Sequence, residues 1–202
     1  MQAIFLEAGH GKNALGMRDV GAVGKFGSAK YQERDIAKEL ALRVLAILKS
    51  KPELVHSLVQ GVGIETDASI IRKMAFVNSV IRENRLTANK CLGIAIHMNA
   101  SGSNKPRGFE VWHQKNNASR PLAEYMVRAW QKYGITPLRP SAINNNKNGR
   151  YGRFYTDDAL CPYLIVETSF ISNLADVTAI ANNLDRTAEC LAHGIMEYVR
   201  SM

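Results

Sequence analysis

The stretch LGIAIH, residues Leu92–His97, decides the fold class of this chain. It is almost continuously apolar over the length of one strand, and such a strand is usually covered by other elements on both faces. Two more stretches have this character, Ala3–Glu7 near the start of the chain and Tyr163–Val166 near its end. Strands buried on both faces are typical of the parallel sheet of an α/β protein.

Segments of helical periodicity alternate with these strands. Apolar residues recur every three or four positions in four segments, which begin near Glu33, Ser69, Pro121 and Leu184. Two further strands are expected, one within Leu58–Ile64 and one over Arg107–His113, where alternating apolar and polar residues predict a more exposed strand. The prediction is a single α/β domain, with a mostly parallel (mixed) twisted sheet of about six strands and helices on both faces.

Two long polar stretches interrupt this alternation. Gly9–Lys30 and Gly134–Asp158 are rich in Gly, Asn and charged residues, and each is expected to be a loop. A loop as long as the second is usually functional or disordered when it lies inside a compact domain.

The composition is that of an ordinary globular protein, with 46% hydrophobic and 22% charged residues among 202. No apolar run approaches the roughly 18 residues that a membrane span needs. The opening residues Met1–Leu6 lack the basic start, long apolar region and small-residue cleavage site of a secretory signal. We therefore expect the chain to be made in the cytoplasm.

The net charge of +8 favours polyanionic partners, although the basic residues are spread along the chain and a solvated basic surface explains them equally well. No helix-turn-helix, RNP-like or zinc-finger pattern is present, so no specific nucleic-acid partner is expected. A monomer is the expected oligomeric state.

Three of the apolar strands run directly into polar residues. His10 follows the first strand, His97 ends the second and Glu167 follows the third. In open α/β sheets the carboxyl ends of the strands line the ligand crevice. Two imidazoles and one carboxylate are therefore expected to converge at one edge of the sheet.

Glu33 is a fourth candidate for the same place. It precedes Ile36 and Leu40 by three and seven residues, which puts it on the inward face of its helix, and it lies in the first turn, where the helix dipole favours an anion. Two His and one Glu form a common catalytic zinc set with a fourth position open for water. Glu167 would then be left to move protons.

Spacing alone leaves structural alternatives open for each residue. His10 could be a turn residue, His97 a core histidine, Glu33 a surface acid and Glu167 a helix cap.

The local sequences favour the functional interpretation. LEAGHG at Leu6–Gly11 resembles the "DPGHGG" motif of the zinc-dependent N-acetylmuramoyl-L-alanine amidases, the family often called amidase type 3. Three later segments are similar to that family's "SIHANA", "GFEVYY" and "VETGFISN" motifs: IAIHMNA at Ile94–Ala100, GFEVW at Gly108–Trp112 and VETSFISN at Val166–Asn173. They occur in the family's order and span nearly the whole chain.

The resemblance implies a role for each residue. His10, Glu33 and His97 would bind one catalytic zinc ion, and Glu167 would be the catalytic carboxylate. Glu7 stands where the family usually has Asp, and it would orient His10 as an outer partner of the metal site. The implied reaction is hydrolysis of the amide bond between N-acetylmuramic acid and L-alanine in peptidoglycan.

Other candidate residues are less closely tied to a motif. Glu110 is a rival general base whose alternation with Phe109 and Val111 predicts that it faces solvent or the crevice edge. Asn99 follows His97 and is a candidate contact for the stem peptide, and so are the two arginines of the second polar stretch, Arg150 and Arg153. The alternative for these arginines is a loop that is merely basic.

Two competing functions remain open. One is a zinc peptidase or deacylase of other specificity on the same scaffold, and the other is a non-enzymatic binder of anionic polymer. Residues 1–202 are all assigned to the catalytic domain, with no separate wall-binding domain. Without a signal, the chain resembles a phage lysis enzyme or a mother-cell enzyme that reaches the cell wall after release, or a chain whose signal has been removed.

Overall fold

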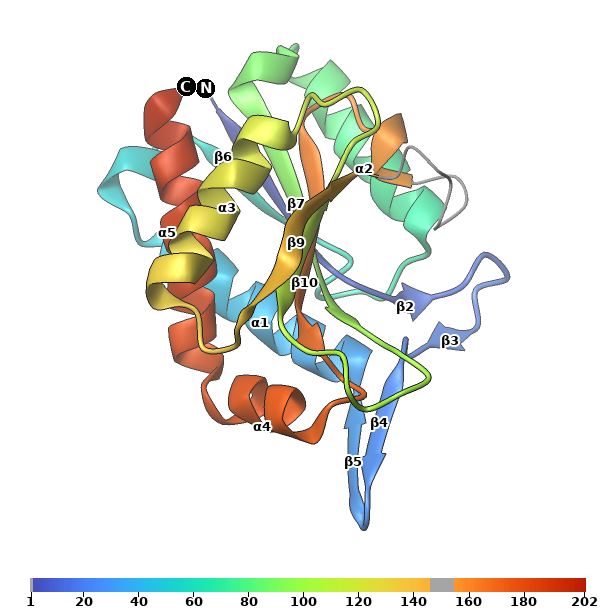
Figure 1. The fold of residues 1–202 in the computed structure, drawn as a ribbon. Coiled ribbons are helices and arrows are strands. Elements are labelled where there is room, and N and C mark those ends of the chain that lie inside the picture. Colours follow the sequence, from blue (N-terminus) through green and yellow to red (C-terminus); the bar gives the residue numbers. More distant parts are fainter. Residues whose placement is uncertain (1, 146–154) are drawn as a thin grey trace.

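The computed structural model describes residues 2–145 and 155–202 and shows a six-stranded sheet flanked by helices (Figure 1). The strand order is β6-β1-β7-β10-β8-β9. In chain order the strands are β1 (Ala3–Ala8), β6 (Leu58–Val62), β7 (Cys91–Asn99), β8 (Phe109–His113), β9 (Leu138–Asn145) and β10 (Tyr163–Phe170). Every neighbouring pair is parallel except β8 with β10, which confirms the predicted mostly parallel sheet.

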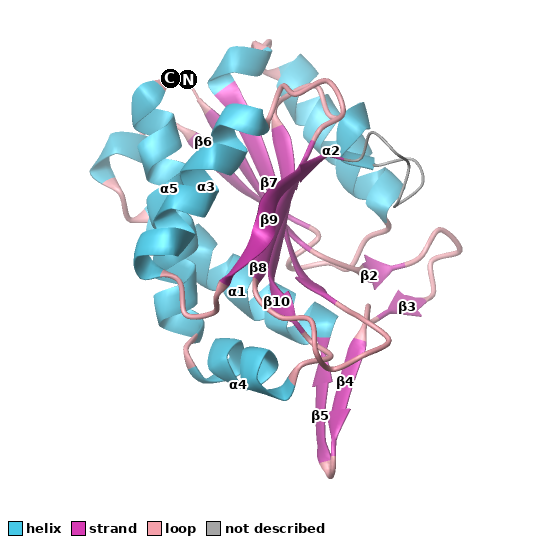
Figure 2. Cartoon of the chain, viewed as in Figure 1, coloured by secondary structure: helices cyan, strands magenta, loops and turns pink. Residues whose placement is uncertain are grey.

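Helices cover both faces of this sheet, also as predicted (Figure 2). They are α1 (Glu33–Lys49), α2 (Ile70–Glu83), α3 (Arg120–Tyr133), α4 (Leu174–Asn182) and α5 (Leu184–Ser201). None of the helices in the described ranges is long and apolar enough to cross a membrane.

The sheet separates two cores because successive side chains of a strand point to opposite faces. Ile4 and Leu6 of β1 belong to the larger core, which includes side chains of α1, α3 and α5. Ala3 and Phe5 belong to the smaller core under α2. Alternate residues of β1 therefore pack into different cores, Ile4 and Leu6 into the larger one and Ala3 and Phe5 into the smaller one.

The first helix begins at Glu33, the residue predicted to open it. Its residues Ile36, Leu40 and Val44 are buried on the face that packs against the sheet. The cap position, Gln32, makes no side-chain cap. Instead, the backbone N–H groups of Glu33 and Arg34 donate to carbonyls of the preceding loop, Ala22 at 3.0 Å and Val20 at 3.1 Å. These bonds hold the loop over the start of α1.

Both polar stretches contain strands, so the prediction that they are loops was wrong in part. The first stretch forms two hairpins, β2 (Gly11–Lys12) with β3 (Arg18–Asp19), and β4 (Val23–Phe26) with β5 (Ala29–Gln32). The β4–β5 hairpin projects from the body of the molecule (Figure 1).

Within the second stretch, β9 pairs in parallel with β8. Its sequence LRPSAINN contains a proline and few apolar residues, which an edge strand tolerates.

The strand predicted to be more exposed is buried at every position. Phe109–His113 forms β8, which has β10 on one side and β9 on the other. The alternating pattern is typical of a half-exposed strand, but neighbours distant in the sequence cover the polar positions as well.

Candidate metal centre and active site

His10, Glu33 and His97 come together at the carboxyl edge of the sheet, as the strand ends predicted. Each residue offers one possible ligand atom, and these atoms all lie within 4.8 Å of one another. His10 Nε2 is 3.0 Å from Glu33 Oε2, and His97 Nδ1 is 2.9 Å from Glu33 Oε1. The carboxylate therefore lies between the two imidazoles.

Glu33 is buried and its two oxygens are held by backbone groups. The N–H of Ala22 donates to Oε2 at 2.9 Å, and the N–H of Met98 donates to Oε1 at 3.1 Å. Burial alone would raise the pKa of Glu33, but the hydrogen bonds to His10 and His97 outweigh it and hold the pKa well below its usual range. Glu33 is therefore an ionised ligand candidate.

This donor set fits a zinc ion. Two imidazoles and one carboxylate leave a coordination position open, as in catalytic zinc sites. Nε2 of His97 is buried and has no hydrogen-bond partner among the residues that the structure describes. Two glycines let the loops pack directly against the imidazole rings. A Cβ atom at Gly21 would lie 2.5 Å from His10 Cδ2, and one at Gly9 would lie 2.6 Å from the His97 ring, so a larger residue at either position would clash with a ring.

Asp19, on β3, is the partner of His10 that sequence reasoning missed. Its Oδ2 lies 3.0 Å from His10 Nδ1, while its Oδ1 accepts a hydrogen bond from the backbone of Gly21 at 3.0 Å. Burial lowers the pKa of His10, whereas Glu33 and Asp19 raise it, with a net result of about 8. Asp19 lies in a polar stretch without periodicity, so no sequence signal pointed to it.

The contact expected of Glu7 is therefore made by Asp19. Glu7 lies two residues after Phe5 and four after Ala3, so its side chain points to the same face of the sheet, the one under α2. There its carboxylate accepts hydrogen bonds from Lys73 Nζ at 3.2 Å and from the Tyr163 hydroxyl at 3.0 Å.

Glu167 lies on β10 in register with His97 of β7 and Glu110 of β8. It is buried, and its Oε2 has no hydrogen-bond partner in the described part of the chain. Burial, and then the charges of Glu33 and Glu110, raise the pKa of Glu167 well above its usual value. A buried carboxyl group with a raised pKa suits general acid and base chemistry.

Glu110 is buried, so the prediction that it faces solvent was wrong, whereas its register with Glu167 places it beside the site. Its Oε1 accepts hydrogen bonds from Asn99 Nδ2 at 2.6 Å and from Trp112 Nε1 at 3.1 Å. Its Oε2 forms an ion pair with Arg139 Nε at 2.7 Å. Side chains of β7, β8 and β9 thus engage both oxygens of this carboxylate.

Of the three residues predicted to contact the substrate, Asn99 lies within the described part of the chain. The Asn99 amide turns toward Glu110, one strand away from Glu167. Arg150 and Arg153 lie outside the described residues.

Fold and site together define a class of protein: an α/β domain with a His-Glu-His group that could hold a metal ion and a buried carboxyl group, both at the carboxyl edge of its sheet. The structure is similar to the catalytic domain of CwlV, an N-acetylmuramoyl-L-alanine amidase from Bacillus (Paenibacillus) polymyxa var. colistinus, with a TM-score of 0.77, 25% identity and 100% of each chain covered. It has the fold of the N-acetylmuramoyl-L-alanine amidase from Clostridium difficile 630, with a TM-score of 0.79, 20% identity, and 99% of this chain and 97% of that chain covered.

Residues 4–197 match the family described as N-acetylmuramoyl-L-alanine amidase, and the chain belongs to this family. A curated relative is N-acetylmuramoyl-L-alanine amidase LytC from Bacillus subtilis (strain 168), 25% identical over 212 residues. That alignment covers 98% of this chain and 36% of the relative, so the chain spans little more than a third of that protein's length.

Proposed function

We propose that this protein is a zinc-dependent N-acetylmuramoyl-L-alanine amidase, which hydrolyses the amide bond between N-acetylmuramic acid and L-alanine in peptidoglycan. The observation that carries the proposal is the grouping of His10, Glu33 and His97 at the strand edge, with the buried Glu167 in register beside His97. Membership of the amidase family supports the choice of bond.

His10, Glu33 and His97 would hold the zinc ion. When bound, zinc lowers the pKa of a coordinated water to about 7 and acts as a Lewis acid toward a carbonyl oxygen. The low pKa of Glu33 keeps it a carboxylate, and the partner Asp19 fixes the orientation of the His10 ring.

Glu167 would accept a proton as water attacks the lactyl carbonyl, and would then donate it to the departing alanine nitrogen. An amine leaves readily only when its nitrogen is protonated, so one group must carry the proton from water to nitrogen. The raised pKa of Glu167 suits this transfer. Glu110 is less suited because Asn99, Trp112 and Arg139 already engage its oxygens.

An open groove beside the site supports a polymeric substrate. It has a volume of about 630 Å³ and begins at Asp19, the partner of His10. Its walls come from the β2–β3 region, the start of α2 and η3 (Tyr155–Asp158), and its lining residues are Lys12, Asn13, Ala14, Asp19, Ser69, Ile70, Ile71 and Asp158. We propose that peptidoglycan lies along this groove, with Asn99, Arg150 and Arg153 as further contacts.

Digestion of purified peptidoglycan, with and without a chelator, tests the proposal. We expect new L-alanine amino groups and muramic acid with a free lactyl carboxylate, identified by mass spectrometry. The chelator should abolish these products and added zinc should restore them. New ends inside the stem peptide would indicate a peptidase, loss of acyl groups would indicate a deacylase, and binding without products would indicate a non-enzymatic binder.

A further inference from the structure

We propose that Lys73 is a positioning residue of the metal site, because it holds the backbone turn that presents His10. This inference deepens the proposed function and rests on it. Lys73 belongs to α2, and its side chain contacts His10 at the backbone carbonyl rather than at the imidazole ring. It acts on His10 through the main chain.

The Lys73 side chain is fully buried, and its three donors match three acceptors. Nζ donates to the carbonyl of Ala8 at 2.7 Å, to the carbonyl of His10 at 2.6 Å and to Glu7 Oε1 at 3.2 Å. An ammonium group has three N–H bonds, so every donor has a partner. Two of the three partners are backbone carbonyls that flank the metal-ligand turn.

The turn needs such support because it leaves the sheet in an unusual conformation. His10 has a φ of 60°, in the left-handed region that a residue with a side chain rarely adopts. Strand β1 ends at Ala8, so the carbonyls beyond it lose the regular pairing of the sheet. Buried carbonyls without partners would cost free energy, and buried cations beside the turn remove that cost.

A second buried cation completes the arrangement from the other side of the sheet. Arg34 of α1 donates from Nη1 to the carbonyl of Gly9 at 3.4 Å and from Nη2 to the carbonyl of Gly63 at 2.8 Å. The carbonyls of Ala8, Gly9 and His10 are thus bound in succession by cations from two helices.

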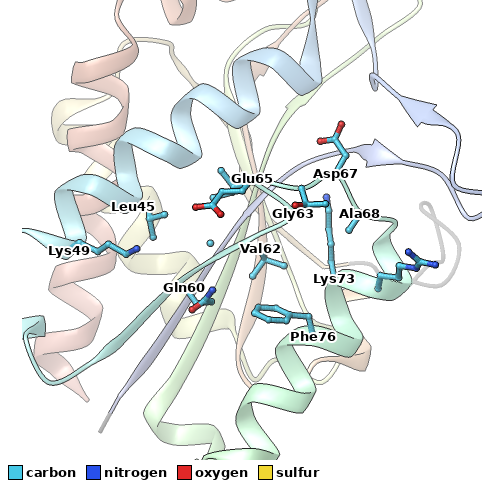
Figure 3. Close-up of a pocket in the computed structure, with 14 residues that line it drawn as sticks. Leu45, Lys49, Gln60, Val62, Gly63, Glu65, Asp67, Ala68, Lys73 and Phe76 are labelled. Atoms are coloured by element: carbon cyan, nitrogen blue, oxygen red, sulfur yellow. The ribbon is translucent and has the colours of Figure 1, made fainter.

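The surroundings of Lys73 are shaped to its stem. Lys73 extends from α2 past Gly63 at the wall of a pocket of about 380 Å³ (Figure 3). A Cβ atom at Gly63 would lie 2.5 Å from Lys73 Cε, and Gly63 has a φ of 61°. The loop therefore closes on the lysine stem at a position that favours glycine.

Glu7 and Tyr163 complete the support beneath the turn. Glu7 balances the charge of Lys73, and the Tyr163 hydroxyl donates to the other oxygen of Glu7. This arrangement separates two roles: Glu7 compensates the charge of Lys73, whereas Lys73 itself binds the carbonyls of Ala8 and His10.

The test compares Lys73→Met with the double variant Glu7→Gln/Lys73→Met and with Met74→Ala. Methionine keeps the length of the stem but binds no carbonyl. Lys73→Met alone would leave the Glu7 carboxylate buried without its cation, and this could prevent folding. The double variant removes that charge as well, so the loss of Lys73 can still be measured in a folded protein. Met74 is the next residue on α2, is buried in the smaller core and serves as the matched control for lost packing.

Zinc affinity, measured by competition with a chromophoric chelator, should fall about 10- to 100-fold in both Lys73 variants, the usual size of an outer-partner effect. Met74→Ala should lower the melting temperature but leave zinc affinity unchanged. The visible spectrum of the cobalt-substituted protein should change in the Lys73 variants alone. A folded double variant that binds zinc as tightly as wild type would overturn the inference.

A crystal structure of the metal-free double variant makes the inference separable from the proposed function. We expect the Ala8–Gly11 turn to move and His10 Nε2 to leave Glu33 Oε2. An unmoved His10 overturns the role of Lys73, whatever the wild-type protein hydrolyses. If the wild type binds zinc but releases no L-alanine amino groups from peptidoglycan, the proposed function fails while the role of Lys73 stands.

Discussion

In the proposed mechanism, Glu167 transfers protons but does not bind the metal ion. It lies in register with His97 but is not one of the three grouped ligand candidates. We expect Glu167→Gln to lower kcat by about 10²- to 10⁴-fold, the usual contribution of general acid–base catalysis, with zinc content unchanged by metal analysis. Glu110→Gln is the matched control, since it lies in register on the next strand. If Glu110→Gln is inactive and Glu167→Gln is active, the roles are exchanged.

Asp19 is the residue expected to tune the metal site through His10. Asp19→Asn keeps an oxygen that can accept from the Gly21 backbone but removes the carboxylate beside His10 Nδ1. Zinc affinity should fall by about tenfold or more, as for other partners of histidine ligands. Competition with a chromophoric chelator measures this, and unchanged affinity would show that Asp19 does not orient the ring.

The raised pKa of His10 gives the metal-free protein a specific pH dependence. Burial lowers this pKa and the partners Glu33 and Asp19 raise it, from 6.5 to about 8. Because the folded pKa exceeds the unfolded one, protonated His10 stabilises the fold fully below pH 6.5, and this contribution is lost as the pH rises through 8. The advantage of wild type over His10→Gln in unfolding free energy should therefore shrink by about 2 kcal/mol across that range. Urea unfolding in the presence of chelator tests it, and an advantage that grows with pH would contradict it.

At the scale of elements, Asp176 ties α4 to two strands. Its buried Oδ2 accepts hydrogen bonds from the backbone N–H groups of Gly108 at 2.6 Å and Phe170 at 3.2 Å. These bonds join the start of β8 and the end of β10, which carry Glu110 and Glu167.

Asp176→Asn should lower the free energy of unfolding by about 1.5–3 kcal/mol, because a hydrogen bond to a charged acceptor is lost and an amide donor can face backbone N–H groups. Asn173→Ala is the control. Asn173 caps α4 by accepting from Asp176 N at 3.1 Å, and its loss should cost about 1 kcal/mol. Urea denaturation measures both, and equal losses would place the effect in α4 alone.

At the scale of the whole molecule, the net charge of +8 predicts how the protein meets an anionic cell wall. Attraction between exposed charges weakens as salt shortens the screening length. Co-sedimentation with intact walls should therefore fall steeply as salt rises, whereas walls stripped of anionic polymers should bind weakly at every salt concentration. Cleavage of a short soluble muropeptide is the control and should change little. If co-sedimentation with intact walls does not change with salt concentration, the net charge has no role in wall binding.

The sequence alone determined the central strands, the helices α1, α2, α3 and α5 and the place of the site, but not α4, the two hairpins or β9. Continuous apolar runs predicted the central strands, and the first helix begins at the predicted Glu33. His10, His97 and Glu167 were predicted from where those strands end, and the structure brings them to one edge of the sheet. Such signals are local, because periodicity and strand length depend only on residues close in the chain.

The partners around the site were decided only by the tertiary structure. Asp19 contacts His10 in place of Glu7. Glu110 is buried and forms an ion pair with Arg139, which lies on β9, a strand within the second polar stretch. Lys73 is one of several charged residues in α2 and has no distinguishing sequence pattern, yet it binds the turn that presents His10. These contacts join residues from elements far apart in the chain. No local pattern records them, since burial and pairing of a polar group depend on what the folded chain places against it.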